Sequence, residues 1–256
     1  MGAATYLYCV VRSAKKPRSG RMPAGLPGSA RARVVAAGRS LWLVVSDVPL
    51  DRYGPERLET GLRDLDWVAQ IAVAHESVVE HFAKMRGTAV VPMKLFTMFS
   101  TEARAAAEMA RRRTHIDAVL KRISGCQEWG VRVMRGAPRP LKVEAPVVPS
   151  GAAFLAARKA VRDTAREALA MANGAAAAVF DELAPIARDA RRRNGAPPGA
   201  IPPLLDAAFL VPAAKRARFR TAARRVARVC AEAGAEMTLT GPWPAYNFVQ
   251  AAEERA

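Results

Sequence analysis

The sequence predicts an α+β protein of two domains, residues 1–124 and 125–256. Short β-prone runs alternate with amphipathic helical stretches throughout the chain. In the second half the order is strand, helix, strand, helix, strand, which is typical of a ferredoxin-like arrangement with helices on one face of a small sheet. The length of 256 residues suits one large domain or two small ones, and 51% hydrophobic residues suffice for a core.

The first domain begins with the apolar run YLYCVV at residues 6–11, which predicts a strand. A loop follows at 12–33, because this stretch contains three Pro and three Gly. Two further apolar runs, 34–37 and 41–46, flank the turn Gly38-Arg39-Ser40. They predict a β-hairpin.

Residues 65–82 carry the strongest helical signal. Asp64 and Asp66 stand where acidic groups cap a helix or favour its first turn. At about 100° per residue, the apolar side chains of this segment fall on one stripe. The stripe consists of Trp67, Ile71, Ala74, Val78 and Phe82. His75 lies on the same side, and we expect it to be a hydrogen-bonded core histidine.

The first domain is expected to end with a strand and a helix. Residues 89–99 predict a strand that is interrupted by Pro92. Ser100 is then a candidate N-cap for a helix that continues to about Ile123. Arg112 falls near the apolar stripe of that helix, so it must extend to solvent or the helix must break there.

The second domain contains one long Ala- and Arg-rich helical stretch, 151–193, with a possible break at Asn173-Gly174. A proline-rich connector at 135–150 precedes it, and the segment 194–203 follows as a loop. The other predicted elements are strands at 128–134, 204–211 and 236–240, a helix at 213–233, and a last segment at 245–249 after the turn GPWP.

Charge, cysteine content and hydropathy indicate the cellular compartment that we expect for the protein. The 40 basic and 23 acidic residues give a net charge of +17, spread over both halves of the chain. The three cysteines form no CxxC pair, which favours a reducing cytoplasm. No apolar stretch approaches the roughly 20 residues of a membrane-spanning helix.

The usual signatures of catalysis are missing from the sequence. It has no phosphate-binding loop of the GxxxxGK[ST] type, no GxGxxG after a strand and no GxSxG elbow. His75-Glu76 begins like the zinc motif HExxH, but Val79 stands at the second histidine position. We therefore expect no enzymatic activity, no cofactor and no metal.

Two segments are candidates for contact with a partner. The loop at 12–33 has seven basic residues and no acidic one, and its central charges are Lys15, Lys16, Arg18 and Arg21. The C-terminal segment GPWPAYNFV concentrates three aromatic residues, Trp243, Tyr246 and Phe248, in a chain with 6% aromatic residues. The alternatives are an unstructured surface loop in the first case and packing onto the domain in the second.

Several segments, in their order along the chain, resemble the GvpF/GvpL family of gas vesicle proteins. The most specific are LTGPWPAYNFV at 239–249, since family members carry a GPWPPYxF-like ending, and the helix with Ala74-His75-Glu76 at its centre. The other resembling segments are YLYCVV at 6–11, VVPMKLFTMF at 90–99, EWGVRV at 128–133 and LLDAAFLV at 204–211.

The chain also departs from the pattern of this family. After the central helix the family usually reads LPLRFGTVF, whereas here Leu95 and Phe96 stand where Phe and Gly would. Ala245 and Asn247 replace the Pro and Ser of the usual ending.

The resemblance implies two α+β domains, the second a modified ferredoxin-like fold, and no catalytic residues. It further implies an accessory protein of gas vesicles that binds the small hydrophobic shell protein, works with other accessory proteins and assists nucleation or assembly of the shell. A cytoplasmic location at the gas vesicle follows from the same resemblance. The alternative hypothesis is a nucleic-acid-binding module that uses the arginine-rich helix at 213–233. Nucleic acid and membrane are not the expected partners.

Overall fold

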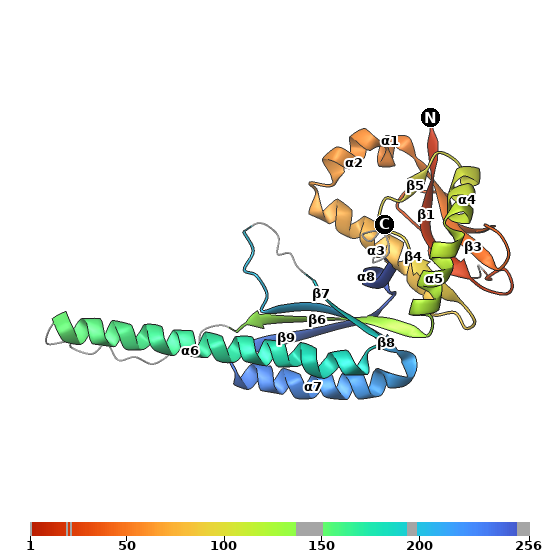
Figure 1. Ribbon diagram of the computed structural model, residues 1–256. Coiled ribbons are helices and arrows are strands. Elements are labelled where there is room, and N and C mark those ends of the chain that lie inside the picture. The colour runs from red at the N-terminus through yellow and green to blue at the C-terminus, as the bar shows by residue number, and fades with distance from the viewer. Residues whose placement is uncertain (1, 19, 21, 137–150, 194–198, 250–256) are drawn as a thin grey trace. The chain divides into compact units, whose positions relative to one another are not determined.

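The computed structural model describes residues 2–18, 20, 22–136, 151–193 and 199–249. The chain forms two compact units (Figure 1). Unit 1 comprises Met1–Gln127 together with Trp243–Ala256, and unit 2 comprises Glu128–Pro242. The sequence analysis assigned everything from residue 125 onward to the second domain, whereas the chain returns to unit 1 at Trp243. The physical reason is that Tyr246 and Phe248 bury their side chains in unit 1.

Unit 1 combines a mixed set of short helices with one antiparallel sheet. Its elements are β1 Ala3–Arg12, β2 Arg33–Ala36, β3 Leu41–Pro49, α1 Leu50–Tyr53, α2 Pro55–Gly61, α3 Leu65–Ala83, β4 Ala89–Pro92, β5 Met98–Phe99, α4 Glu102–Arg111, α5 Arg113–Ile123 and α8 Tyr246–Val249.

Strand β1 is the centre of the sheet, whose order is β2-β3-β1-β4. β1 pairs with β3 along its whole length, and its other edge is shared by β4 and β5. Its run of apolar residues follows from this position, because a strand that is covered on both faces buries consecutive side chains. The prediction of a strand at residues 6–11 is confirmed.

A bulge in β1 adjusts which side chains face α3. The register between β1 and β3 shifts between Leu7 and Cys9. Tyr8 and Cys9 are therefore both buried in the cluster that includes Tyr6 and the α3 residues. Leu7 and Val10 are fully buried as well. They alternate with that set and point to the other face, and α4 also contacts β1.

Two predicted elements of unit 1 differ in detail, and two short helices were not predicted. The strand expected over 89–99 is two strands, because the backbone turns between them at Phe96, whose φ is 63°. The helix expected over 100–123 breaks at Arg112 and begins after the N-cap Thr101 instead of Ser100. The short helices α1 and α2 were not predicted, since neither is long enough to show helical periodicity.

Unit 2 has the element order βαββαβ. Its elements are β6 Cys126–Arg135, α6 Gly151–Leu183, the 3-10 turn η1 Ala184–Ile186, β7 Asp189–Arg192, β8 Leu205–Pro212, the 3-10 turn η2 Ala213–Lys215, α7 Arg216–Glu232 and β9 Ala235–Trp243. The strands form an antiparallel sheet in the order β7-β8-β6-β9. Figure 1 shows α6 and α7 side by side along this sheet, and both contact β8.

The long helical prediction over 151–193 is wrong at its end. α6 continues through Gly174 without a break and stops at Leu183, and the chain then adds the strand β7. β7 has the sequence DARR and lies at the sheet edge beside β8. An edge strand with polar residues carries no apolar alternation, so after an Ala-rich helix its sequence resembles more helix.

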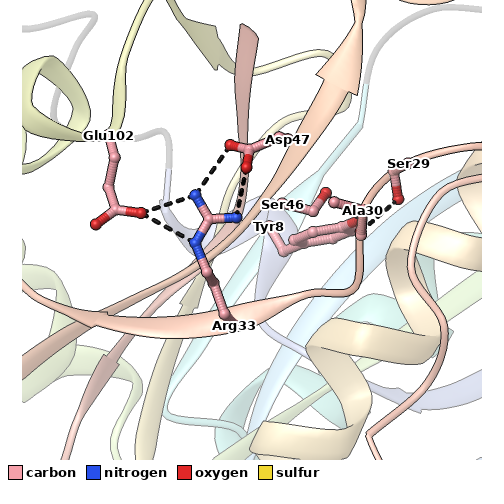
Figure 2. A network of polar contacts seen from close by, with 7 residues as sticks. All are labelled: Tyr8, Ser29, Ala30, Arg33, Ser46, Asp47 and Glu102. Atoms are coloured by element: carbon pink, nitrogen blue, oxygen red, sulfur yellow. Dashed lines mark hydrogen bonds and ion pairs between the residues drawn. The ribbon is translucent and has the colours of Figure 1, made fainter. Parts of the chain in front are cut away.

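An arginine connects the sheet of unit 1 to α4 (Figure 2). Arg33 of β2 donates two hydrogen bonds to the carboxylate of Asp47, at 3.0 and 2.9 Å, and two to Oε2 of Glu102, at 3.0 and 2.8 Å. These hydrogen bonds raise the pKa of Arg33. The planar guanidinium meets both carboxylates at once, which an ammonium group does not do.

We expect Arg33→Lys to lower the free energy of unfolding by about 1 kcal/mol, because the bidentate contact is lost and the partly exposed charges are screened by solvent. Urea unfolding of purified protein measures the change. Arg31→Lys is the matched control, since Arg31 is exposed and forms no ion pair with the described residues. Equal stability of the two variants would show that the network contributes nothing.

Candidate partner-binding surfaces

The basic loop predicted as a partner contact places three of its four central charges on the surface. Lys15, Lys16 and Arg18 are exposed, and none of the three forms an ion pair with the described residues. Arg21 lies outside the described residues. The loop as a whole is not unstructured, because Leu26 is 3% exposed and its backbone N–H donates to the hydroxyl of Tyr8 at 3.0 Å. The charges therefore lie on a loop that is anchored to unit 1.

The three C-terminal aromatic residues separate in the structure. Trp243 keeps 44% of its surface exposed, whereas Phe248 is fully buried. Tyr246 is partly buried, and its hydroxyl donates to Oε2 of Glu76 at 2.5 Å. Phe248 cannot serve as an exposed anchor, since its side chain belongs to the interior of unit 1. Trp243 is the member of this set that remains accessible to a partner.

A network of polar side chains joins α3 to β1 and α8 inside unit 1. Tyr6 and His75 share a hydrogen bond of 2.8 Å between the hydroxyl and Nδ1. His75 is 2% exposed, so the prediction of a core histidine is confirmed. Burial lowers the pKa of His75 to about 4, although a hydrogen bond with the Met93 backbone acts in the opposite direction. Burial also raises the pKa of Tyr6 and, together with Glu76, that of Tyr246.

Among the described residues, no cluster of His, Cys, Asp and Glu has the form of a metal site. No described helix combines the length and the apolarity needed to cross a bilayer. Cys9 and Cys230 are buried, as expected, and burial raises the pKa of both thiols. Both thiols thus belong to the interiors of the units.

The exposed face of α3 carries large apolar side chains. Leu65 is 80% exposed and Val73 68% exposed, and Leu62, just before the helix, is 54% exposed. Val73 lies two residues after the buried Ile71 and two before the buried His75. At about 100° per residue it therefore points away from both. Leu65, Ala69 and Val73 follow each other at intervals of four residues, so they share this outward face.

A small pocket of about 170 Å³ adjoins the start of α3. The Trp67 ring is stacked on Phe96, with 5.6 Å between ring centroids, and the Arg57 guanidinium lies 6.0 Å from the centroid of the Trp67 ring. Neither Arg52 nor Arg57 forms an ion pair with a described carboxylate. The pocket is lined by Pro27, Arg52, Tyr53, Arg57, Trp67, Gln70 and Ile71. The pocket thus combines two aromatic side chains with two arginines, of which Arg52 donates a hydrogen bond to the carbonyl of Pro27.

Sequence reasoning missed the α3 surface, which we call the α3 row (Leu62, Leu65, Ala69 and Val73). The signal was present. On a helical wheel Val73 falls opposite the stripe that contains Ile71 and Val78, and a large apolar residue at such a position is unusual on a solvated helix.

The family of the protein follows from comparison with known proteins. Residues 4–250 match the model of the family described as gas vesicle synthesis protein GvpL/GvpF. The chain belongs to the GvpL/GvpF family. The segments that carry the resemblance in the sequence, including Ala74-His75-Glu76 and the ending at 239–249, fall inside this match.

Individual relatives agree with this membership. Gas vesicle protein L of Streptomyces sp. (strain CB03234) is 28% identical over 260 residues, which cover 97% of this chain and 94% of that protein. The crystal structure of GvpF from Anabaena sp. PCC7120 superposes with a TM-score of 0.67 at 15% identity and covers 97% of both chains. GvpF from Microcystis aeruginosa gives a TM-score of 0.66 at 14% identity, over 96% of this chain and 99% of that one. The solved structures show that the fold is shared.

We expect the stability of unit 1 to fall in mild acid because of His75. Its pKa is about 4 in the folded state and 6.5 in an unfolded chain, so the unfolded chain binds the proton between these values. The stabilisation is complete above pH 6.5 and is lost as the pH falls toward 4. From pH 7 to pH 5 the loss is about 2 kcal/mol.

Urea unfolding at both pH values measures this slope. His75→Gln should flatten it, while His115→Gln on α5 should leave it unchanged. A slope that persists in His75→Gln would show that another group carries the pH dependence.

Proposed function

We propose that this protein is a non-enzymatic accessory factor of gas vesicle formation, which binds the small hydrophobic shell protein and assists nucleation or assembly of the shell. Membership of the GvpL/GvpF family supports the accessory role. The observation that carries the binding step is the exposure of Leu65 and Val73 at 80% and 68% on α3. Other gas vesicle accessory proteins are the further partners that we infer, and the cytoplasm, at the gas vesicle, is the inferred location.

The physical argument rests on an apolar face that unit 1 leaves uncovered. Removing one Leu or Val side chain from water is worth about 1.5–3 kcal/mol, so the α3 row favours an apolar partner. Exposed apolar surface on a folded protein commonly marks an interaction site. A subunit that is rich in apolar surface before assembly is such a partner, and its contact with the α3 row keeps that surface from aggregating.

Charge has a different role in this proposal. The basic residues Lys15, Lys16 and Arg18 remain in solvent and keep the protein soluble while it holds an apolar subunit. The side chain of Trp243 is the C-terminal aromatic that remains open to contact. For unit 2, we infer the modified ferredoxin-like fold, which is supported by the βαββαβ order and the strand order β7-β8-β6-β9.

A second candidate function, binding of nucleic acid, is favoured by one observation on α7. Arg216, Arg220, Arg224 and Arg228 are exposed and follow each other at intervals of four residues. None of the four forms an ion pair with a described carboxylate. A contact of this kind weakens steeply as salt rises, whereas an apolar contact does not.

We expect the variant Leu65→Ser/Val73→Ser to bind the shell protein at least tenfold more weakly than the original chain, because two apolar contacts are lost. Co-expression with the shell protein, followed by pull-down at low and at moderate salt, measures retention. Ile201→Ser is the matched control, since Ile201 is 75% exposed but lies in unit 2.

Retention that is unaffected by the α3 changes, or reduced equally by the control, would place the contact elsewhere. If nothing is retained while nucleic acid co-purifies and is removed by salt, the row of arginines on α7 gives the function instead.

A further inference from the structure

Helix α6 is packed within unit 2 only along its second half. Its buried residues are Ala172, Ala176, Val179 and Leu183. From Gly151 to Ala168 its residues are exposed, with only Ala153 and Ala157 half-buried. Figure 1 shows the green first half of α6 continuing well beyond the end of α7. At 1.5 Å per residue, this stretch is about 27 Å long.

The apolar stripe of α6 does not stop where the packing stops. At about 100° per residue, Phe154, Val161 and Ala165 lie on the same side of the helix as the buried Ala172 and Val179. Phe154 is 53% exposed and Val161 56% exposed. The side that packs against the sheet in the second half is therefore uncovered by the described residues in the first half. We call residues 154–171 of this side the α6 face.

A row of arginines borders the α6 face along one edge. Arg158, Arg162 and Arg166 are exposed, stand four residues apart, and form no ion pair with the described residues. The opposite edge is uncharged and consists of Ala157, Thr164 and Met171. The acidic residues of this stretch, Asp163 and Glu167, lie on the back of the helix at about 180° and 220° from Phe154.

This charge pattern does not fit a second copy of the chain. In an antiparallel pair of identical helices each edge meets itself, so the arginine rows would repel each other. In a parallel pair the arginine row would meet the uncharged edge of Ala157, Thr164 and Met171. In neither arrangement do the three cations gain a carboxylate.

The α6 face also fits a bilayer surface poorly. Helices that lie on membranes have one apolar face rich in Trp, Phe or Leu and an opposite polar face rich in Lys and Arg. Here alanine predominates in the stripe, and the acidic Asp163 and Glu167 occupy the back. Small residues in the stripe instead permit close approach of a second helix.

We propose that the α6 face docks an amphipathic α-helix of a partner protein, whose apolar stripe packs against Phe154 and Val161 and whose row of Asp or Glu residues pairs with Arg158, Arg162 and Arg166. This inference does not depend on the proposed function, because it concerns a different unit. It also accounts for the length of α6, since a helix that extends from its domain gains most of its stability from tertiary packing.

The test uses the full chain and two synthetic 21-residue helical peptides. Both carry Leu at heptad core positions; one has Glu along one flank, and the other has Lys at the same positions. Fluorescence anisotropy measures their affinities. We expect the Glu peptide to bind at least tenfold more tightly than the Lys peptide, and its affinity to fall by about fivefold in Arg158→Glu.

Lys159→Glu is the matched control, because it makes the same charge change one residue further on, about 100° around the helix and away from the stripe. We expect it to change the affinity less than twofold. Circular dichroism of both variants establishes that α6 is retained.

Three results of the binding experiment would overturn the proposal: no binding of the Glu peptide, equal binding of both peptides, or equal effects of the two variants. Slow hydrogen exchange over residues 154–171 in the free chain would overturn it as well, because it would mean that the α6 face is already covered. Dimerisation through α6 in sedimentation would replace the partner by a second copy, and binding to phosphatidylserine vesicles that Phe154→Ser abolishes would replace it by a lipid surface.

Discussion

Unit 1 depends on two neighbouring polar side chains of α3 that find their hydrogen-bond partners inside the protein. His75 pairs with Tyr6 of the central strand, and Glu76 accepts a hydrogen bond from Tyr246 of α8. A buried polar group without a partner costs free energy, so these pairs act together with the buried apolar stripe of α3 to favour the observed rotation of the helix about its axis. That rotation turns Val73 outward. The contacts on the buried side of α3 therefore decide which of its residues face solvent.

Both units depart from the ordinary rule that large apolar residues are covered. In unit 1 the departure concerns one helix face, where Leu65 and Val73 stand opposite a well-packed stripe. In unit 2 it concerns the length of one helix, because the apolar stripe of α6 continues beyond the part of the helix that is buried. Such departures from local consistency are expected where a protein trades stability for recognition. They differ in chemistry, since the α3 row adjoins an aromatic pocket and the α6 face adjoins a row of arginines.

The sequence was most informative where one strong signal acted alone. The helix around His75, its cap at Asp64 and the burial of His75 all followed from local pattern, and the structure has each of them. Of the two alternatives left open at Arg112, the structure shows the helix break. β7 was missed because Asp189–Arg192 has no apolar alternation; its strand conformation comes from pairing with β8. Phe248 was predicted as a contact residue from the high aromatic content of the C-terminal segment. That content does not reveal which hydrophobic core the segment packs into.

The left-handed backbone at Phe96 shows why a departure from the family pattern is explained only by the folded structure. Glycine is the usual residue at a φ of 63°, and the family pattern that the sequence resembles has glycine at this position. The Phe96 ring stacks on Trp67, with an interplanar angle of 6°, and this contact offsets the backbone strain. The departure from the family pattern is thus balanced by a tertiary contact.

The return of the chain to unit 1 at Trp243 has a consequence for biosynthesis. The ribosome delivers Met1–Gln127 first, but Tyr246 and Phe248 emerge only after all of Glu128–Pro242 has been made. Until then Glu76 lacks the hydroxyl that it binds in the finished protein. Unit 1 is therefore incomplete until the segment that follows unit 2 in the chain has been synthesised.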